Sequence, residues 1–128
     1  MNNQNNIVLD TNALINYLEG YELEVDLVGD KQIVISEISE MEIQCNPNLK
    51  ASDRSVLKQF LKTLIVIPLH NQIKEKSIDI RLTTRMKLMD SIVAATAQIC
   101  GISLVTSDEK FKSVKTITLI LLPAVDKR

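Results

Sequence analysis

Aromatic residues are scarce in this sequence, which has no tryptophan, two tyrosines and two phenylalanines, or 3% of its 128 residues. The core must therefore be aliphatic, built from isoleucine, leucine, valine and alanine. Cysteine is also rare, and Cys45 and Cys100 stand isolated, without the spacing of a metal site. We interpret both as reduced thiols in the core of a cytoplasmic protein, because disulfides are rare in reducing compartments.

Other absences exclude several kinds of site. Three glycines cannot form a glycine-rich phosphate loop, and the single histidine, His70, anchors no convincing Ser/Cys–His–Asp set. No apolar run reaches transmembrane length, and residues 1–6 are interpreted as a polar tail rather than a signal peptide. The formal net charge of −1 excludes a general electrostatic attraction to nucleic acid and leaves room only for a local basic patch.

What is present is an ordinary globular composition, 45% hydrophobic and 24% charged, in a chain of one-domain length. Short apolar runs predict strands, and apolar residues three and four apart predict helices. Val56 and Ile78 are among the helix residues expected to face the core. The strands are expected at residues 7–9, 32–35, 65–67, 103–106 and 116–122; the helices at 13–18, 22–28, 37–45, 52 or 53 to 64, 70–84 and 88–100. This alternation predicts an α/β domain over residues 1–128, with a parallel sheet covered on both faces.

Two aspartates follow predicted strands directly. Asp10 ends the first strand and Asp108 follows the fourth, and ligands of parallel α/β sheets bind at such carboxyl ends. If the two strands are neighbours where the strand order reverses, these carboxylates face each other and repel unless a cation lies between them. Oxygen ligands without histidine or cysteine suit Mg²⁺ or Mn²⁺. The alternative is that each aspartate only caps the helix or turn that follows.

A third carboxylate, Glu42, lies on an apolar stripe of its predicted helix. Ile38, Met41 and Cys45 form the stripe, whereas Glu37 and Glu40 fall on faces where solvated glutamates belong. A glutamate on a buried stripe is costly unless it is paired or binds a metal. The alternatives to a ligand role are a helix-edge glutamate that reaches solvent and a buried salt bridge.

The fourth carboxylate, Asp90, stands near the start of an almost wholly apolar helix. Ala94 and Ala97 share its face, and their small side chains are expected to leave room for a metal or a phosphate. The alternative is that Asp90 is an N-cap or a first-turn acid that the helix dipole favours.

Together these residues resemble the PIN-domain family of metal-dependent nucleases, most closely its VapC-type toxins. Four segments carry the resemblance: VLDTN at 8–12, ISEISEME at 35–42, KLMDSIVAATA at 87–97 and LVTSDEKF at 104–111. Two positions depart from the family pattern, Met89 where proline is common and Ser107 where a basic residue is common. The resemblance implies a three-layer α/β/α domain with sheet order 3-2-1-4-5, often a homodimer, and neutralisation by a partner antitoxin.

The resulting hypothesis is a cytoplasmic endoribonuclease, a hydrolase that cleaves RNA phosphodiesters with water activated by Mg²⁺ or Mn²⁺. Asp10, Glu42, Asp90 and Asp108 would hold the metal, and Asn12 and Thr106 would orient ligands or water. Basic residues near the third and fourth acids are expected to include contacts to RNA phosphates, although solvated side chains are the alternative for each; they are Arg81, Arg85, Lys87, Lys110, Lys112 and Lys115.

Three other classes of protein compete with this hypothesis. A phosphorylated receiver domain needs an acceptor aspartate after its third strand, where this chain has Pro68, Leu69 and His70. A haloacid-dehalogenase-like phosphatase needs a second aspartate at position 12, which is Asn12. The serious alternative is a non-catalytic PIN-like module that binds RNA or protein, and a binding surface needs none of the four carboxylates.

Overall fold

The computed structural model describes residues 5–128. The part of the expected polar tail that precedes residue 5 lies outside the described residues, and Asn6 is already the first residue of strand β1. The elements follow in the order β1 Asn6–Leu9, α1 Thr11–Leu18, α2 Glu22–Val28, β2 Gln32–Ser36, α3 Glu37–Ile43, α4 Ala51–Leu61, β3 Ile65–Ile67, α5 Asn71–Thr84, α6 Leu88–Cys100, β4 Leu104–Thr106, the 3₁₀ helix η2 Glu109–Ser113, β5 Leu119–Leu121 and the 3₁₀ helix η3 Val125–Lys127.

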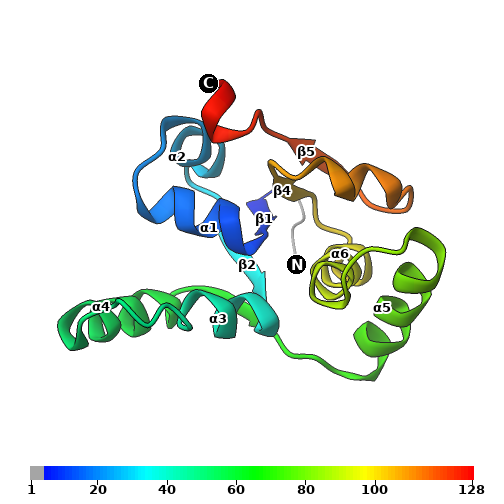
Figure 1. The fold of residues 1–128 in the computed structure, drawn as a ribbon, viewed down its shortest axis with the longest axis horizontal. Helices are drawn as coiled ribbons and strands as arrows, with labels where there is room; N and C mark the ends of the chain where they lie inside the picture. The colour runs from blue at the N-terminus through cyan, green and yellow to red at the C-terminus, as the bar shows by residue number, and fades with distance from the viewer. Residues whose placement is uncertain (1–4) are drawn as a thin grey trace.

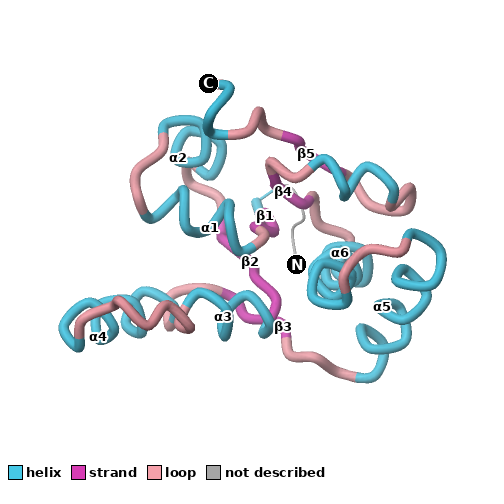
Figure 2. Tube along the Cα trace, viewed as in Figure 1, coloured by secondary structure: helices cyan, strands magenta, loops and turns pink. Residues whose placement is uncertain are grey.

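The five strands form one parallel sheet in the order β3-β2-β1-β4-β5, which confirms the expected topology (Figures 1 and 2). β1 lies between β2 and β4, pairing Val8 with Val34 on one side and Leu9 with Val105 on the other. The strand order therefore reverses at β1, and its carboxyl end is the switch point where open α/β sheets bind ligands.

Alternating side chains of the strands supply two aliphatic cores, one on each face of the sheet. Val8, Val34 and Leu104 pack with α5 and α6 on one face. Ile7, Leu9, Ile33, Ile35 and Val105 pack on the other face with residues of α1, α2, α3 and α4. In Figure 1, α5 and α6 lie side by side on the right, and α1 to α4 lie on the left. The three-layer α/β/α arrangement follows, as predicted.

Four side chains expected in the core are exposed instead. Val56 on α4, Ile78 on α5 and Met41 on α3 are 70%, 54% and 58% exposed. Cys45 is also exposed and its thiol donates to the Met41 carbonyl, while Cys100 is half-buried. Polar residues take inward positions in two of these helices, Ser39 in α3 and Ser77 in α5. Periodicity missed these positions because a buried serine does not belong to an apolar stripe.

Helix boundaries agree with the sequence to within a few residues. α4 begins at Ala51 rather than at Ser52 or Asp53, and β5 is confined to Leu119–Leu121, shorter than the expected run. Within residues 5–128, no helix is long and apolar enough to cross a membrane.

Candidate active site

Asp10 stands at the carboxyl end of β1 and is only 7% exposed. It caps α1, because Oδ1 accepts a hydrogen bond from the Ala13 amide at 2.8 Å. Oδ2 accepts a hydrogen bond from the Thr106 hydroxyl at the end of β4. The capping role that the sequence suggested is therefore real, and it holds the carboxylate in one orientation at the switch point.

The Asp10 carboxyl is poorly suited to carrying a charge in this position. Its pKa is raised from 3.8 to about 6, mainly by burial and to a smaller extent by the negative charges of Asp108 and Asp90. The hydrogen bonds from Thr106 and Ala13 act in the opposite direction but do not cancel the effect. A buried acid with a raised pKa beside other acids is a feature of functional sites.

Thr106 connects the first acid to the fourth. Its hydroxyl donates to Asp10 and accepts a hydrogen bond from the Asp108 amide at 3.0 Å. Asp108 caps η2, since its Oδ1 accepts from the Lys110 amide at 2.9 Å. Neighbouring strands β1 and β4 thus bring together two aspartates that are far apart in sequence, as the sequence predicted.

Glu42 reaches the site from α3. Thr11, the first residue of α1, donates its hydroxyl to Glu42 Oε1 at 2.8 Å and lies 3.1 Å from the buried Ser39 hydroxyl. Glu42 is half-buried and faces inward, but not because of the stripe that the sequence suggested, since Met41 and Cys45 face solvent. The sequence analysis missed Thr11, although its position next to Asp10 at a helix start was the available signal.

The two other glutamates of α3 lie on different surfaces. Glu37 is not simply solvated, because its Oε1 accepts a hydrogen bond from the Leu69 amide at 3.1 Å and ties α3 to the β3–α5 connection. Glu40 lines a shallow surface hollow with residues of α4, away from Thr11. Only Glu42 of the three contacts the Asp10 segment.

Asp90 lies in the first turn of α6 and is half-buried. Burial raises the pKa of its carboxyl, and the charges of Asp108 and Glu42 raise it further, partly offset by Lys110 and Lys87. Ala94 and Ala97 do not leave a space beside it, because both are buried in the core between α6 and the sheet. Their small size instead lets α6 pack close to the strands.

The carboxylates suit a hard divalent cation in kind, because oxygen ligands without histidine or cysteine favour Mg²⁺ or Mn²⁺. Glu42 and Asp108 each spend one oxygen on a hydrogen bond to the described residues and leave the other, Oε2 and Oδ2, free for a ligand. Within residues 5–128, however, no three Asp, Glu, His or Cys side chains are grouped closely enough to hold an ion.

Four of the six predicted basic residues divide into two groups. Lys87 and Lys110 are exposed and lie close enough to Asp90 to affect its pKa. Arg81 instead donates from Nη1 to the carbonyls of Arg85 and Met86, at 3.0 and 2.6 Å, and so closes the end of α5. Arg85 is the left-handed C-cap of that helix, with φ of 62°. The first group lies beside the acids, and the second has a structural role.

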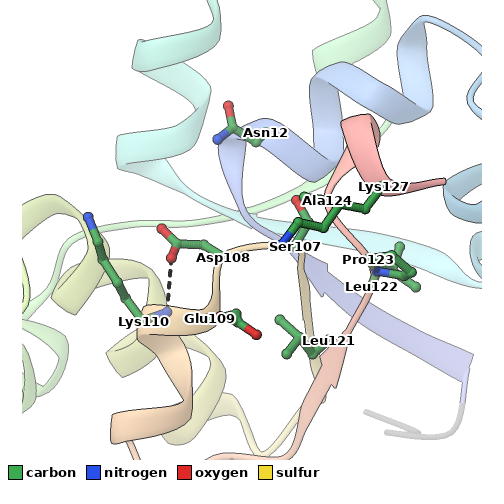
Figure 3. A pocket seen from close by; sticks show the side chains of 10 residues that line it. All are labelled: Asn12, Ser107, Asp108, Glu109, Lys110, Leu121, Leu122, Pro123, Ala124 and Lys127. Atoms are coloured by element: carbon green, nitrogen blue, oxygen red, sulfur yellow. Dashed lines mark hydrogen bonds between the residues drawn. The ribbon is translucent and has the colours of Figure 1, made fainter.

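Asn12 differs from its expected position. It is exposed and lines a cavity next to Asp108, together with Ser107 and Lys110 (Figure 3). The hydrogen bonds that orient the acids come instead from Thr106 and Thr11. The polar side chains next to the acids thus form two sets, one holding the carboxylates and one facing an open cavity.

Fold and site together define an α/β protein with a cluster of acids at the switch point of its parallel sheet. The chain belongs to the PIN domain family, whose model matches residues 7–117. This confirms the resemblance drawn from the four sequence segments. None of the curated proteins matches the chain significantly.

Several solved structures share this fold. A toxin–antitoxin complex from Klebsiella pneumoniae contains a chain with 25% identity and a TM-score of 0.80, with 92% of this chain and 99% of that chain covered. VapBC2 from Rickettsia felis, bound to a DNA fragment from its promoter, has 20% identity and a TM-score of 0.78, with 91% and 98% covered. DNA-bound VapBC from Salmonella typhimurium has 20% identity and a TM-score of 0.74, with 90% and 96% covered. The match extends over nearly the whole of each chain.

Proposed function

We propose that this protein is a metal-dependent endoribonuclease that hydrolyses RNA phosphodiester bonds. The observation that carries the proposal is the convergence of four acids from four separate segments. Burial and mutual repulsion raise the pKa of Asp10 and Asp90, with Asp108 and Glu42 among the repelling charges. Such repulsion is unfavourable for a binding module, and a bound divalent cation would relieve it.

Within the proposal, Asp10 is the fixed ligand, because the Ala13 amide and the Thr106 hydroxyl hold both of its oxygens in place. Glu42 on α3, Asp90 on α6 and Asp108 at the N-cap of η2 would be the other ligands. A bound Mg²⁺ or Mn²⁺ would activate water for attack and neutralise charge on the phosphate. Lys87 and Lys110 sit beside Asp90, where they would hold the RNA backbone by its phosphates.

We also propose that the protein is the toxin of a toxin–antitoxin pair. An apolar groove of about 420 Å³ between α1 and the α3–α4 segment ends at Glu42, and its lining includes Ile15, Leu18, Ile43, Leu49 and Leu57. An apolar segment of an antitoxin that carries a basic residue would fit it, since Glu19 and Glu42 also line the groove. A partner seated there would cover one of the four acids.

The expected homodimer and the cytoplasmic location belong to the same proposal. Exposed apolar side chains stand on α5 and at the start of α6, with Ile78, Leu82, Leu88 and Met89 between 43% and 76% exposed. Apolar residues on one region of a surface favour a protein interface, and two-fold symmetry is the default for identical subunits. An RNA substrate and an antitoxin partner would both be met in the cytoplasm.

The test is cleavage of a mixed single-stranded RNA pool with Mg²⁺ or Mn²⁺, with EDTA, and with the Asp90→Asn protein in metal. We expect cleavage only by the wild type in metal. A folded wild type that binds the RNA without cutting it under all these conditions would establish the alternative, a non-catalytic PIN-like module.

A further inference from the structure

A cavity of about 740 Å³ opens directly beside the acidic cluster, on the side of β4 and β5. Asp108, Ser107 and Lys110 form the wall next to the acids, with Asn12 opposite (Figure 3). The far wall is apolar and consists of Leu121, Leu122, Pro123 and Ala124. Its size lies within the range of small-molecule sites, and its mixture of apolar surface, amide, hydroxyl and ammonium groups is the mixture that a nucleotide requires.

A second lysine enters this cavity from the last segment of the chain. Lys127 lines it, and in Figure 3 its side chain runs from the 3₁₀ helix η3 toward Ser107. Lys110 also lines the cavity, next to Asp108. Positive charge beside a carboxylate cluster allows a phosphate to approach acids that would otherwise repel it.

Segment 123–128, which carries Lys127, is fixed by a nearly buried ion pair. Arg128 donates from Nη1 and Nη2 to the two oxygens of Glu24 on α2, at 2.7 and 2.8 Å, and from Nε to the Pro123 carbonyl at 3.0 Å. Glu24 is 1% exposed and also accepts a hydrogen bond from Asn16 at 2.9 Å. Burial alone would raise the pKa of the Glu24 carboxyl, but the hydrogen bonds from Arg128 and Asn16 lower it below its usual value.

We propose that this cavity holds the nucleotide next to the cleaved phosphodiester, that Lys127 binds its phosphate, and that the Glu24–Arg128 pair positions the segment carrying Lys127. The inference rests on the proposed ribonuclease function and adds a subsite to it. The apolar wall lies against the base or ribose of the nucleotide. Asn12 and Ser107 offer hydrogen bonds to the polar edges of the nucleotide. Lys127 is a substrate-binding residue, and Arg128 is a positioning residue that touches no RNA.

The test compares RNA binding and cleavage in matched variants. Lys127→Ala removes the charge, Lys127→Arg keeps it, and Arg128→Gln releases the segment without changing Lys127. Lys31→Ala is the matched control, because Lys31 is exposed just before β2, at the amino edge of the sheet opposite the site. Each variant is combined with Asp90→Asn, and its binding of a single-stranded RNA is measured by fluorescence anisotropy over a series of salt concentrations. KM and kcat are measured on the same variants with Asp90 intact.

The logarithm of the RNA-binding constant falls linearly with the logarithm of the salt concentration. Removal of one phosphate contact should make this slope shallower by about 0.7, which corresponds to about fivefold weaker binding at about 0.1 M salt. We expect this from Lys127→Ala and Arg128→Gln, with KM raised and kcat nearly unchanged, and not from Lys127→Arg or Lys31→Ala. If the wild type cleaves RNA and Lys127→Ala keeps its KM and salt slope, the subsite is wrong and the ribonuclease proposal stands. If the wild type neither binds nor cleaves RNA, both proposals are overturned.

Discussion

Replacing Asp10 with asparagine tests the electrostatics of the site through stability, without any need for a known substrate. Burial and the neighbouring acids raise the pKa of Asp10 from 3.8 to about 6. At about 1.4 kcal/mol per pH unit, the ionised group destabilises the fold by about 3 kcal/mol at neutral pH. The sign follows from a folded pKa above the unfolded one: the penalty is complete above about pH 6 and fades as the pH falls toward 3.8.

Asparagine removes the charge and keeps the shape of the side chain. Its Oδ1 can still accept from the Ala13 amide, but the Thr106 hydroxyl loses its carboxylate acceptor, which costs about 1 kcal/mol. At neutral pH in EDTA, we therefore expect Asp10→Asn to unfold with a free energy about 2 kcal/mol greater than that of the wild type. Toward pH 4 the order should reverse, as the wild-type carboxyl gains its proton and keeps both hydrogen bonds.

Urea denaturation of both proteins in EDTA from neutral to mildly acidic pH measures this difference. The Glu24 carboxyl, whose pKa is lowered, titrates in both proteins, so its contribution cancels in the comparison. Mn²⁺ should stabilise the wild type by about 2.7 kcal/mol at one hundred times its dissociation constant, and the mutant much less. A constant difference in unfolding free energy across the pH range, or equal stabilisation of both proteins by Mn²⁺, would refute the reasoning.

Three further predictions follow from single contacts. Glu42→Gln should reduce RNA cleavage at least a hundredfold, whereas Glu40→Gln, which changes a glutamate facing α4, should cleave normally; equal rates for the two variants would remove Glu42 from the site. Leu82→Glu should convert a dimer to a monomer in sedimentation experiments, while Val56→Glu, an equally exposed change on α4, should not; a wild type that is monomeric at micromolar concentration would contradict the dimer. Arg85→Gly should raise the unfolding free energy by about 0.5–1 kcal/mol, because only glycine adopts a φ of 62° without steric cost. Thermal melting measures this change. A lower melting temperature for the variant would show that the Arg85 side chain stabilises the α5–α6 connection.

The fold was predictable because it depends on patterns that are repeated along the chain. Each strand contains a run of aliphatic residues, and the alternation with helices predicts a parallel layered sheet. Local patterns did not predict which residues of a helix face inward. In α3 and α5 the inward positions include serines, and Met41 and Ile78 are exposed. Burial there depends on which neighbouring elements cover the helix, and the spacing of apolar residues does not give that information.

The acids of the site were predictable for a different reason, and their supporting contacts were not. A carboxylate after a buried strand is conspicuous in a sequence, whereas Thr11 and Thr106 are ordinary until β1, β4 and α3 are brought together. The Glu24–Arg128 pair joins residues 104 positions apart, and nothing in either local segment indicates it. Contacts of this kind depend on the tertiary structure alone.

Capping and ligand binding are compatible roles for the carboxylates of Asp10 and Asp108. A capping hydrogen bond occupies one lone pair of a carboxylate that has about four acceptor positions. Asp108 caps η2 through Oδ1 and keeps Oδ2 free of hydrogen bonds to residues 5–128, and Asp10 caps α1 through one oxygen while the other meets Thr106. The cap also removes the rotational freedom that a ligand would otherwise have to restrict. The same hydrogen bond that starts a helix therefore preorganises a carboxylate at the switch point, so a capping aspartate at the end of a parallel strand is a stronger candidate for function than an uncapped one.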